Sequence, residues 1–330
     1  MTPSPHLIHG YRLDAQAVRA ELRDGLSQRP ARIAPKFLYD ALGSRLFDAI
    51  CELDEYYPTR TEAAIVAACR DDLARRVPRG AAWFDLGAGN GAKAERLFDL
   101  LRPRAYVALD FSSDYLGDAL RAMAQRHPSL PLLGLGIDFA ARLDLPDAAE
   151  TWLAGVGGGS VPRVVLYPGS SIGNFAPAEA LALLTQAHAL CRAGGPGGGL
   201  LIGVDRVKAR DVLEPAYDDP LGVTAAFNRN LLRHVNRWLG SDFRPGAWRH
   251  VAFYNEADSR IEMHLQADGV QCVSHAAGTW RFEDGERIHT ENSWKWAPAD
   301  FTRLLQAAGF GEPVHWTDAR GWFSVFWAPA

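Results

Sequence analysis

Residues 83–98 read WFDLGAGNGAKAERLF, and this stretch decides the fold class of the chain. It starts with an apolar run of the kind that fills a buried parallel strand. Gly87, Gly89 and Gly91 then interrupt the run before helical spacing resumes at Ala92. A glycine turn lets the backbone approach a ligand with no Cβ in the way, and the helix that follows directs free N–H groups at an electronegative group. The stretch therefore predicts a strand, a turn and a helix that together hold a cofactor.

An acid stands at the end of the next apolar run. Residues 105–109 predict a second strand, and Asp110 follows it directly. An acid at the tip of the second strand, roughly 20 residues beyond the first glycine, is placed to accept hydrogen bonds from ribose hydroxyls. The cofactor is therefore expected to carry a ribose, and both a dinucleotide and S-adenosylmethionine fit this pattern.

Three further apolar runs, residues 132–137, 161–167 and 200–204, predict additional strands. Asp138 and Phe139 end the first of these runs, where an acid and an aromatic ring can hydrogen-bond and cover a purine. Small residues and Asn174 follow the second run, at the sheet edge where open α/β folds bind ligands. Because the strands alternate with helical segments, we expect a doubly wound, mostly parallel sheet.

The alternation stops after residue 205. A helix is predicted at 225–239, and short alternating runs between residues 251 and 296 predict antiparallel strands of an inserted α+β domain. Near the C-terminus, a predicted helix at 299–308 precedes strands at 314–316 and 322–327. These two strands predict a hairpin that closes the sheet, as is usual in S-adenosylmethionine methyltransferases and unusual in dinucleotide dehydrogenases.

The N-terminal part is predicted to be helical. Helices are expected at 13–26 and 37–53, and a third at 62–75 with Thr59 or Thr61 as its cap. The two tyrosines before this third helix, Tyr56 and Tyr57, are then expected in a loop. The first ten residues contain prolines and predict a loose segment.

Composition limits the classes of partner. The chain has 330 residues, a net charge of −4 and no dense run of Lys and Arg, which argues against nucleic acid and anionic membranes as partners. Its four cysteines have no CxxC spacing, its ten histidines have no metal-binding spacing, and no apolar stretch approaches the roughly 18 residues of a membrane span. We therefore expect a cytoplasmic monomer without a metal, whose partner is a small molecule.

Several separate strings resemble the L-histidine Nα-methyltransferase family of ergothioneine biosynthesis, and the resemblance runs along nearly the whole chain. The strings are PKFLYD at 35–40, EYYPTRTE at 55–62, GSSIGN at 169–174, AYDD at 216–219, GVTAAFNRN at 222–230, RIEM at 260–263 and TENS at 290–293. The resemblance implies a Rossmann-like methyltransferase sheet and S-adenosylmethionine as the cofactor. It also implies trimethylation of the L-histidine α-amine to hercynine, the first step of ergothioneine biosynthesis, without a metal.

The same resemblance assigns the site residues. The cofactor would bind Gly87, Lys93, Asp110, Asp138 and Phe139. The substrate would bind Tyr56, Asn174, Tyr217, Glu291 and Ser293, and Tyr39, Phe47 and Met263 would line its pocket. On this basis, we expect residues 60–205 and 298–330 to form the cofactor-binding domain and residues 10–59 and 206–297 the substrate-binding domain.

The residue types agree with these assignments. Glu291 and Ser293 stand two apart on a predicted strand, so both side chains face one side, where a carboxylate and a hydroxyl could engage an imidazole. Asn174 could donate to a substrate carboxylate or orient the amine, and its structural alternative is a turn residue. The Tyr217 hydroxyl could meet a substrate carboxylate, and its structural alternative is a loop. Aromatic rings can hold a quaternary ammonium by cation–π attraction, which needs no N–H donor on the ligand.

Other functions remain open on sequence grounds. Within the fold, the alternative is a methyltransferase for another amino acid or small amine. An NAD(P) oxidoreductase is disfavoured by the closing hairpin and by the GxGxG spacing, and a silent S-adenosylmethionine-binding module is a third possibility. A nucleic-acid methyltransferase is disfavoured because the fourth strand lacks an NPPY-type tetrapeptide. Either a tyrosine hydroxyl or water could accept the proton that the substrate amine must lose.

Overall fold

The structure is a computed structural model that describes residues 5–8 and 15–330. By its internal contacts, the chain forms two compact units. The large unit contains the described residues before position 12 together with Pro58–Val207 and Lys295–Ala330. The small unit contains the described part of Arg12–Tyr57 together with Lys208–Trp294. The assignment of cofactor to one part of the chain and of substrate to the other stays a prediction.

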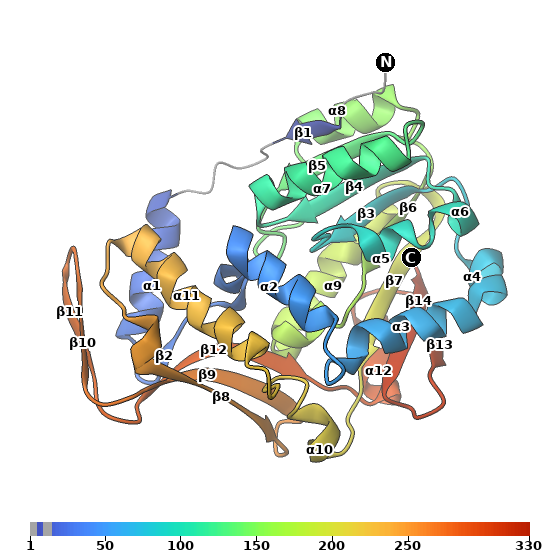
Figure 1. Cartoon of the computed structure of the whole chain (residues 1–330). Helices are drawn as coiled ribbons and strands as arrows, with labels where there is room; N and C mark the ends of the chain where they lie inside the picture. The colour runs from blue at the N-terminus through green and yellow to red at the C-terminus, as the bar shows by residue number, and fades with distance from the viewer. Residues whose placement is uncertain (1–4, 9–14) are drawn as a thin grey trace. The chain divides into compact units, whose positions relative to one another are not determined.

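Within the described residues, the large unit has one eight-stranded sheet of order β1-β5-β4-β3-β6-β7-β14-β13 (Figure 1). The strands are β1 His6–Ile8, β3 Ala82–Leu86, β4 Ala105–Asp110, β5 Leu132–Gly136, β6 Pro162–Tyr167, β7 Gly195–Asp205, β13 Val314–Thr317 and β14 Phe323–Pro329. Strands β1 to β7 of this sheet pair in parallel, whereas β14 runs antiparallel to both β7 and β13. The predicted mostly parallel sheet and its closing hairpin are confirmed.

Helices cover both faces of this sheet because neighbouring residues of each strand point to opposite sides. Phe84 belongs to a core that includes residues of α8 Asp147–Gly155, α9 Pro177–Arg192 and α12 Pro298–Ala307. Trp83, one position earlier, belongs to a second core on the other face. That core includes residues of α3 Tyr57–Ala68, α4 Arg70–Arg76, α5 Ala92–Glu95, α6 Phe98–Leu101 and α7 Ser113–Arg126. Figure 1 shows α7 lying across β4 and β5. The doubly wound arrangement is confirmed.

Some predicted boundaries in the large unit are wrong. The helix expected from residue 62 begins at Tyr57, so Tyr57 is not a loop residue and Thr59 and Thr61 are not its caps. Pro58 is compatible with this earlier start because the first turn of a helix needs no N–H partner. Residues 6–8 were expected to be loose, but they form β1 by pairing with β5. The helical spacing that resumes at Ala92 corresponds to two short helices, α5 and α6, and not to one continuous helix.

The described part of the small unit is built on a four-stranded sheet of order β2-β12-β9-β8, with a separate two-stranded hairpin, β10-β11. Its strands are β2 Ala31–Arg32, β8 Trp248–Asn255, β9 Arg260–Ala267, β10 Gln271–His275, β11 Gly278–Phe282 and β12 Arg287–Trp294. Its helices are α1 Ala15–Ser27, α2 Ala41–Cys51, α10 Arg210–Leu213 and α11 Val223–Leu239, and its 3₁₀ turns are η1 Pro35–Leu38 and η3 Pro245–Ala247. The predicted antiparallel strands are therefore present.

Helix α11 packs on β8 and β9 of this sheet, and α2 packs against α11 (Figure 1). The side chains of Asn228 and Arg229 on α11 donate hydrogen bonds to the carbonyls of His264 and Trp248, at 3.1 and 2.8 Å. The helix predicted at 37–53 is interrupted because the Asp40 carboxylate accepts the N–H of Gly43 at 2.7 Å and caps α2 there. Asn230 of α11 donates to the same carboxylate at 2.7 Å, which joins the two helices.

In the described ranges, 5–8 and 15–330, no helix is both long enough and apolar enough to span a membrane.

Candidate functional site

The glycine turn after β3 has the backbone that the sequence predicts. Gly87, Gly89 and Gly91 have φ values of 65°, 54° and 71°, a region that residues with a Cβ rarely adopt. A Cβ on Gly87 would lie 3.7 Å from the ring of Phe139, and a Cβ on Gly89 would find open space within 4 Å. The turn therefore exposes backbone that a ligand can approach closely.

Asp110, the last residue of β4, faces this turn. One carboxylate oxygen accepts the N–H of Gly89 at 2.9 Å, and the other accepts the N–H of Ser112 at 2.9 Å. Each carboxylate oxygen can accept more than one hydrogen bond, so both keep capacity for ribose hydroxyls. Burial raises the pKa of Asp110, although the backbone N–H groups oppose this shift. The structure thus joins Asp110 to the turn, and the ribose contact that its spacing predicts stays a prediction.

The other three predicted cofactor residues also lie in the large unit. Lys93 is on α5, directly after the turn, and its Nζ lies 3.8 Å from Oε2 of Glu62. The ring of Phe139 meets the ring of Tyr167 edge-on, with centroids 5.9 Å apart. Asp138 accepts the N–H of Ala141 at 3.4 Å, which gives it a role in the turn after β5.

A buried acid in β3, Asp85, had no functional role in the sequence prediction. It is 1% exposed, and the Tyr106 hydroxyl donates to its Oδ2 at 2.6 Å. Its Oδ1 has no hydrogen-bond partner within the described residues. Burial raises the pKa of Asp85 to about 7. A Cβ on Gly91 would lie 3.3 Å from the Tyr106 hydroxyl, so the hydrogen-bonded residues Asp85 and Tyr106 lie next to the glycine turn. An acid inside an apolar strand was the available signal.

In the small unit, five aromatic residues form one cluster. Ring centroids are 5.6 Å apart for Tyr39–Phe47, 5.5 Å for Tyr39–Phe227, 6.0 Å for Phe47–Phe227, 6.0 Å for Phe47–Tyr56 and 6.4 Å for Tyr56–Tyr217. The structure thus brings together four residues that the resemblance assigns to the substrate. Phe227, on α11, is an addition that sequence reasoning missed, although it lies within the string at 222–230.

Burial raises the pKa of Tyr56 well above its ordinary value, and the neighbouring Tyr217 adds to this shift. The Tyr56 phenol therefore keeps its proton at neutral pH. In this state it can donate a hydrogen bond, and it is a poor proton acceptor.

Tyr217 is fixed at both ends. Its hydroxyl lies 2.7 Å from the hydroxyl of Ser293, and its backbone carbonyl accepts the Nε2–H of His250 at 2.8 Å. Because Nε2 carries the proton, Nδ1 of His250 accepts the amide N–H of Asn228, at 2.9 Å. Burial lowers the pKa of His250, which favours this neutral form. His250 and Asn228 had no place in the sequence prediction because only the folded sheet brings them to Tyr217.

A β-bulge in β12 sets the direction of the predicted substrate residues. His289 pairs with His264 and Glu291 pairs with Met263, so Thr290 is one residue too many on its strand. Such an insertion reverses the alternation of side chains beyond it. As a result, Glu291 and Ser293 lie on the same face as Met263, and all three are at least nine-tenths buried. His289, which would share a face with Glu291 in a regular strand, lies on the other face.

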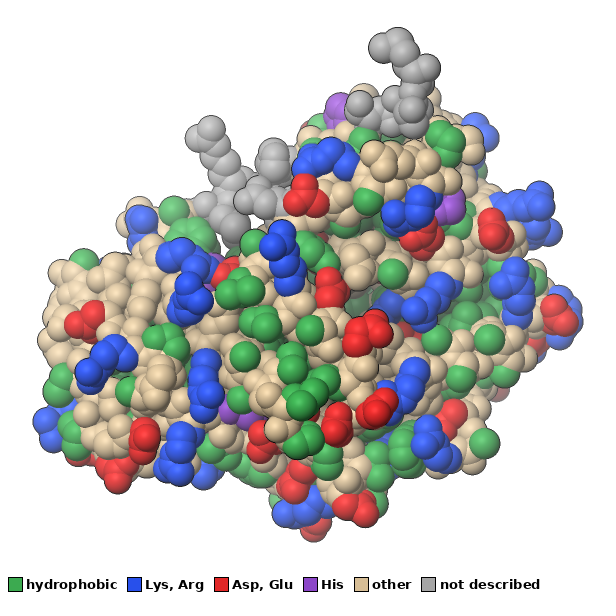
Figure 2. All heavy atoms as spheres, viewed as in Figure 1, with side chains coloured by type: hydrophobic (Ala, Val, Ile, Leu, Met, Phe, Trp, Pro, Cys, Tyr) green, Lys and Arg blue, Asp and Glu red, His purple; other side chains and the backbone are tan. Residues whose placement is uncertain are grey.

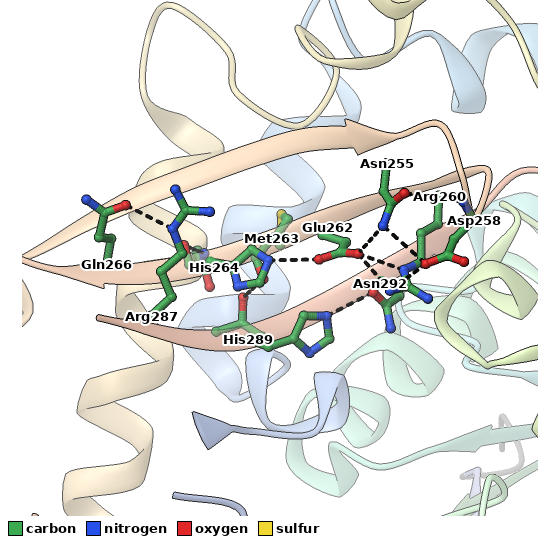
Figure 3. A network of polar contacts seen from close by, with 12 residues as sticks. Asn255, Asp258, Arg260, Glu262, Met263, His264, Gln266, Arg287, His289 and Asn292 are labelled. Carbon is green, nitrogen blue, oxygen red and sulfur yellow. Dashed lines mark hydrogen bonds and ion pairs between the residues drawn. The ribbon is translucent and has the colours of Figure 1, made fainter. Parts of the chain in front are cut away.

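That other face carries a polar network (Figure 3). Its centre is Glu262, which accepts hydrogen bonds from Arg260 and from Asn255 at 2.9 Å, and lies 3.1 Å from Nε2 of His264. Burial would raise the pKa of Glu262, but the hydrogen bonds from Asn255, Arg260 and His264 outweigh it and lower the pKa to about 2. Figure 3 also shows His289 directed at Asn292, and their hydrogen bond measures 2.9 Å.

Asn174 belongs to the large unit, where it ends the 3₁₀ turn η2 Ser171–Asn174 beyond β6. The preceding Ser170 has a left-handed backbone, with φ 65°, and its hydroxyl accepts the N–H of Asp205 at 2.8 Å. This bond ties the η2 turn to the end of β7. The position at the carboxyl end of a parallel strand is the one that the sequence predicts.

A mostly parallel sheet closed by an antiparallel hairpin, with an acid facing a glycine turn, is the arrangement of the S-adenosylmethionine-dependent methyltransferases. The family model described as "Histidine-specific methyltransferase, SAM-dependent" matches residues 18–330, and the chain belongs to this family.

Curated relatives extend this comparison. The chain is 38% identical to the histidine N-alpha-methyltransferase of Mycobacterium tuberculosis, over 94% of both chains. It is also 38% identical to the enzyme of that name from Mycolicibacterium smegmatis, again over 94% of both chains. An N-methyltransferase of Aspergillus flavus is 27% identical, over 91% of this chain and 82% of the relative.

The residues around the turn fit the cofactor of the family, S-adenosylmethionine. The open backbone at Gly89 leaves room for a ligand, the Asp110 carboxylate can accept ribose hydroxyls, and Phe139 offers a ring beside Gly87. Lys93 adds a positive charge at the start of α5. The roles of the individual residues remain predictions.

Proposed function

We propose that the protein transfers methyl groups from S-adenosylmethionine to the α-amine of L-histidine, three times, and so forms hercynine for ergothioneine biosynthesis. The observation that carries this proposal is the buried face of β9 and β12 in a member of the histidine-specific family. Glu291, Ser293 and Met263 share that face, and the Tyr217 hydroxyl bonds to Ser293.

The side chain of the substrate would bind at this face. An imidazole needs a hydrogen-bond acceptor for its N–H and a donor for its other nitrogen. The Glu291 carboxylate can accept, and the Ser293 hydroxyl can donate. His250 holds the backbone of Tyr217, and each of the two hydroxyls has a single hydrogen. When Ser293 donates to the imidazole, the Tyr217 hydroxyl can therefore donate to the substrate carboxylate in place of the bond between the two hydroxyls. Asn174 is the other predicted contact of the substrate.

S-adenosylmethionine supplies a methyl group that is already activated by its sulfonium. The protein therefore has to hold a neutral amine in line with the donor, at about 3–3.5 Å. Because the Tyr56 phenol keeps its proton, we assign it to orienting the amine and not to removing its proton. Water is then the acceptor that we favour for that proton.

The aromatic cluster would allow three transfers at one place. Each methyl group removes an N–H donor from the nitrogen, and the final product is a permanent cation. A ring face gains about 0.5–2 kcal/mol from such a cation without any directional partner. Tyr39, Phe47 and Tyr56 are the rings assigned to this role, and Phe227 supports the first two from α11.

We also propose a cytoplasmic monomer whose partner is this small molecule. All four cysteines lie in the described part of the chain and none forms a disulfide, which agrees with a reducing compartment. On the face drawn in Figure 2, Lys and Arg side chains lie interspersed with Asp and Glu, whereas a nucleic-acid surface would gather one sign of charge.

The experiment that tests the function offers purified protein S-adenosylmethionine with a panel of amino acids and small amines. Mass spectrometry of the products should show methylated histidine as the main product. Preferential methylation of another amino acid or amine would support the alternative N-methyltransferase function. No transfer to any of them, with S-adenosylmethionine still bound, would indicate a silent binding module.

A further inference from the structure

Two side chains of opposite charge meet beside the glycine turn of the large unit. Oε1 of Glu62 accepts the N–H of Gly169 at 2.9 Å, and Oε2 of Glu62 lies 3.8 Å from Nζ of Lys93. The Glu62 side chain is 9% exposed and the Lys93 side chain 29%. Glu62 is therefore fixed by a backbone donor, and Lys93 is partly open to solvent.

Two glycines make room for this pair. A Cβ on Gly203 would lie 2.1 Å from Oε1 of Glu62, and a Cβ on Gly169 would lie 2.2 Å from Nζ of Lys93. Gly169 follows the carboxyl end of β6, and Gly203 lies near the carboxyl end of β7. The pair thus reaches the sheet edge where ligands bind in this fold. Both charged residues also line one pocket, together with Pro168 and Gly203.

The pair is incomplete as an ion pair. The distance of 3.8 Å between Nζ of Lys93 and Oε2 of Glu62 is too long for a hydrogen bond. In the described part of the chain, neither of these two atoms makes a hydrogen bond to any other group. A largely buried carboxylate is costly unless charged or polar groups satisfy it. Both atoms can therefore accept a further charged partner.

We propose that Lys93 and Glu62 form a receptor for the zwitterionic amino-acid end of S-adenosylmethionine. Lys93 takes the α-carboxylate, and Oε2 of Glu62 takes the α-ammonium, while Oε1 keeps its bond to Gly169. The resemblance assigns Lys93 to the cofactor, and Glu62 is the new contact. A zwitterion matches the pair because it brings one charge of each sign to the same place. The proposal concerns the cofactor alone, so it stands or falls separately from the choice of histidine as substrate.

Asp85 is the competing acid beside the turn. It is bonded to Tyr106 beneath Gly91, and its burial raises its pKa to about 7, so a substantial fraction is uncharged at neutral pH. Glu62 instead meets the backbone of Gly169, just beyond the carboxyl end of β6, and this position favours it as the partner of an ammonium. The variant Asp85→Asn belongs in the same experiment, because a loss specific to the amino-acid end would assign the ammonium to Asp85 instead.

The experiment is calorimetry with the ligand-free protein and two probes. S-adenosylhomocysteine carries the amino-acid end, and 5′-methylthioadenosine has the same nucleoside and thioether without it. We expect Glu62→Gln to weaken S-adenosylhomocysteine about tenfold, or about 1.4 kcal/mol, and to change 5′-methylthioadenosine less than about twofold. The glutamine keeps an acceptor for the Gly169 N–H, so the fold should survive, which thermal melting checks. Asp71→Asn, at an exposed position of α4, is the control for loss of one negative charge.

A third probe separates the two contacts. Decarboxylated S-adenosylhomocysteine keeps the ammonium, so Glu62→Gln should weaken it while Lys93→Met should not. If Glu62→Gln weakened the binding of S-adenosylhomocysteine and 5′-methylthioadenosine equally, the proposal would be overturned. Glu62 would then only stabilise the turn at Gly169. Unchanged S-adenosylhomocysteine binding, or a selective loss in Asp85→Asn instead, would also overturn it.

Discussion

Glu262 and Glu291 lie on neighbouring strands of the small unit and are 9% and 7% exposed, but they occupy opposite faces of the sheet. Glu262 is bound by side chains of its own face, among them Arg260 and His264. Glu291 shares its face with Met263 and Ser293, and lies close enough to Tyr56 to raise the pKa of that phenol. Burial alone therefore does not separate a carboxylate held within its sheet from one that we predict to bind the substrate. The neighbours of the carboxylate make the distinction.

The largest expected effect belongs to Glu291. Because an unpaired imidazole N–H in a closed pocket is costly, Glu291→Ala should weaken histidine binding by about 2–5 kcal/mol. Selectivity against apolar side chains should relax, while S-adenosylhomocysteine affinity stays the same. Titration calorimetry with histidine, with an apolar amino acid and with S-adenosylhomocysteine checks all three. Normal histidine binding by the variant would assign Glu291 to the structure and remove the contrast with Glu262.

In the large unit, Asp110 tests whether a carboxylate that is already bound within the fold can also bind a ligand. Its carboxylate already accepts two backbone N–H groups, yet we predict that it binds ligand. Asp110→Ala should weaken S-adenosylhomocysteine about tenfold or more, since a charged hydrogen bond contributes roughly 1.5–3 kcal/mol. Calorimetry on a variant that still melts cooperatively gives the answer. If affinity is retained, the ribose binds elsewhere.

Glu262→Gln should destabilise the fold by about 1–3 kcal/mol at neutral pH without affecting histidine binding. The folded pKa of about 2 lies below the ordinary 4.5, so the carboxylate stabilises the fold fully above pH 4.5. This contribution is lost as the pH falls towards 2. Denaturant unfolding at several pH values should therefore show the two proteins converging in acid. A constant difference between pH 7 and pH 3 would contradict the structural role.

His250→Phe should have the smallest effect of the series. It removes the hydrogen bond to the Tyr217 carbonyl, a net loss of about 0.5–1.5 kcal/mol, and also the bond from the Asn228 amide, which keeps its bond to the His264 carbonyl. Histidine KM should rise several-fold with S-adenosylhomocysteine affinity unchanged, and His250→Gln, which keeps a donor, should recover part of the loss. Equal losses in both variants would point to packing as the role of His250.

The sequence predicts the large unit better than the small one. The strand, the glycine turn and Asp110 were predictable because local periodicity and spacing encode them. The bulge at Thr290 was not, because pairing with β9 creates it, and nothing within β12 marks the extra residue. Glu62 and Lys93 are 31 positions apart in the chain, so only the folded sheet shows that they meet. Their roles as site residues, like those of the substrate residues, are still predictions.

The most direct test of the central claim is mass spectrometry of a limited-turnover reaction with histidine. If the aromatic cluster holds the methylated amine, monomethyl- and dimethylhistidine should bind at least as tightly as histidine, and trimethylated product should appear early with little released intermediate. Release of monomethylhistidine as the main product, with dimethylhistidine a poor substrate, would contradict the account even if histidine and S-adenosylmethionine bind as proposed.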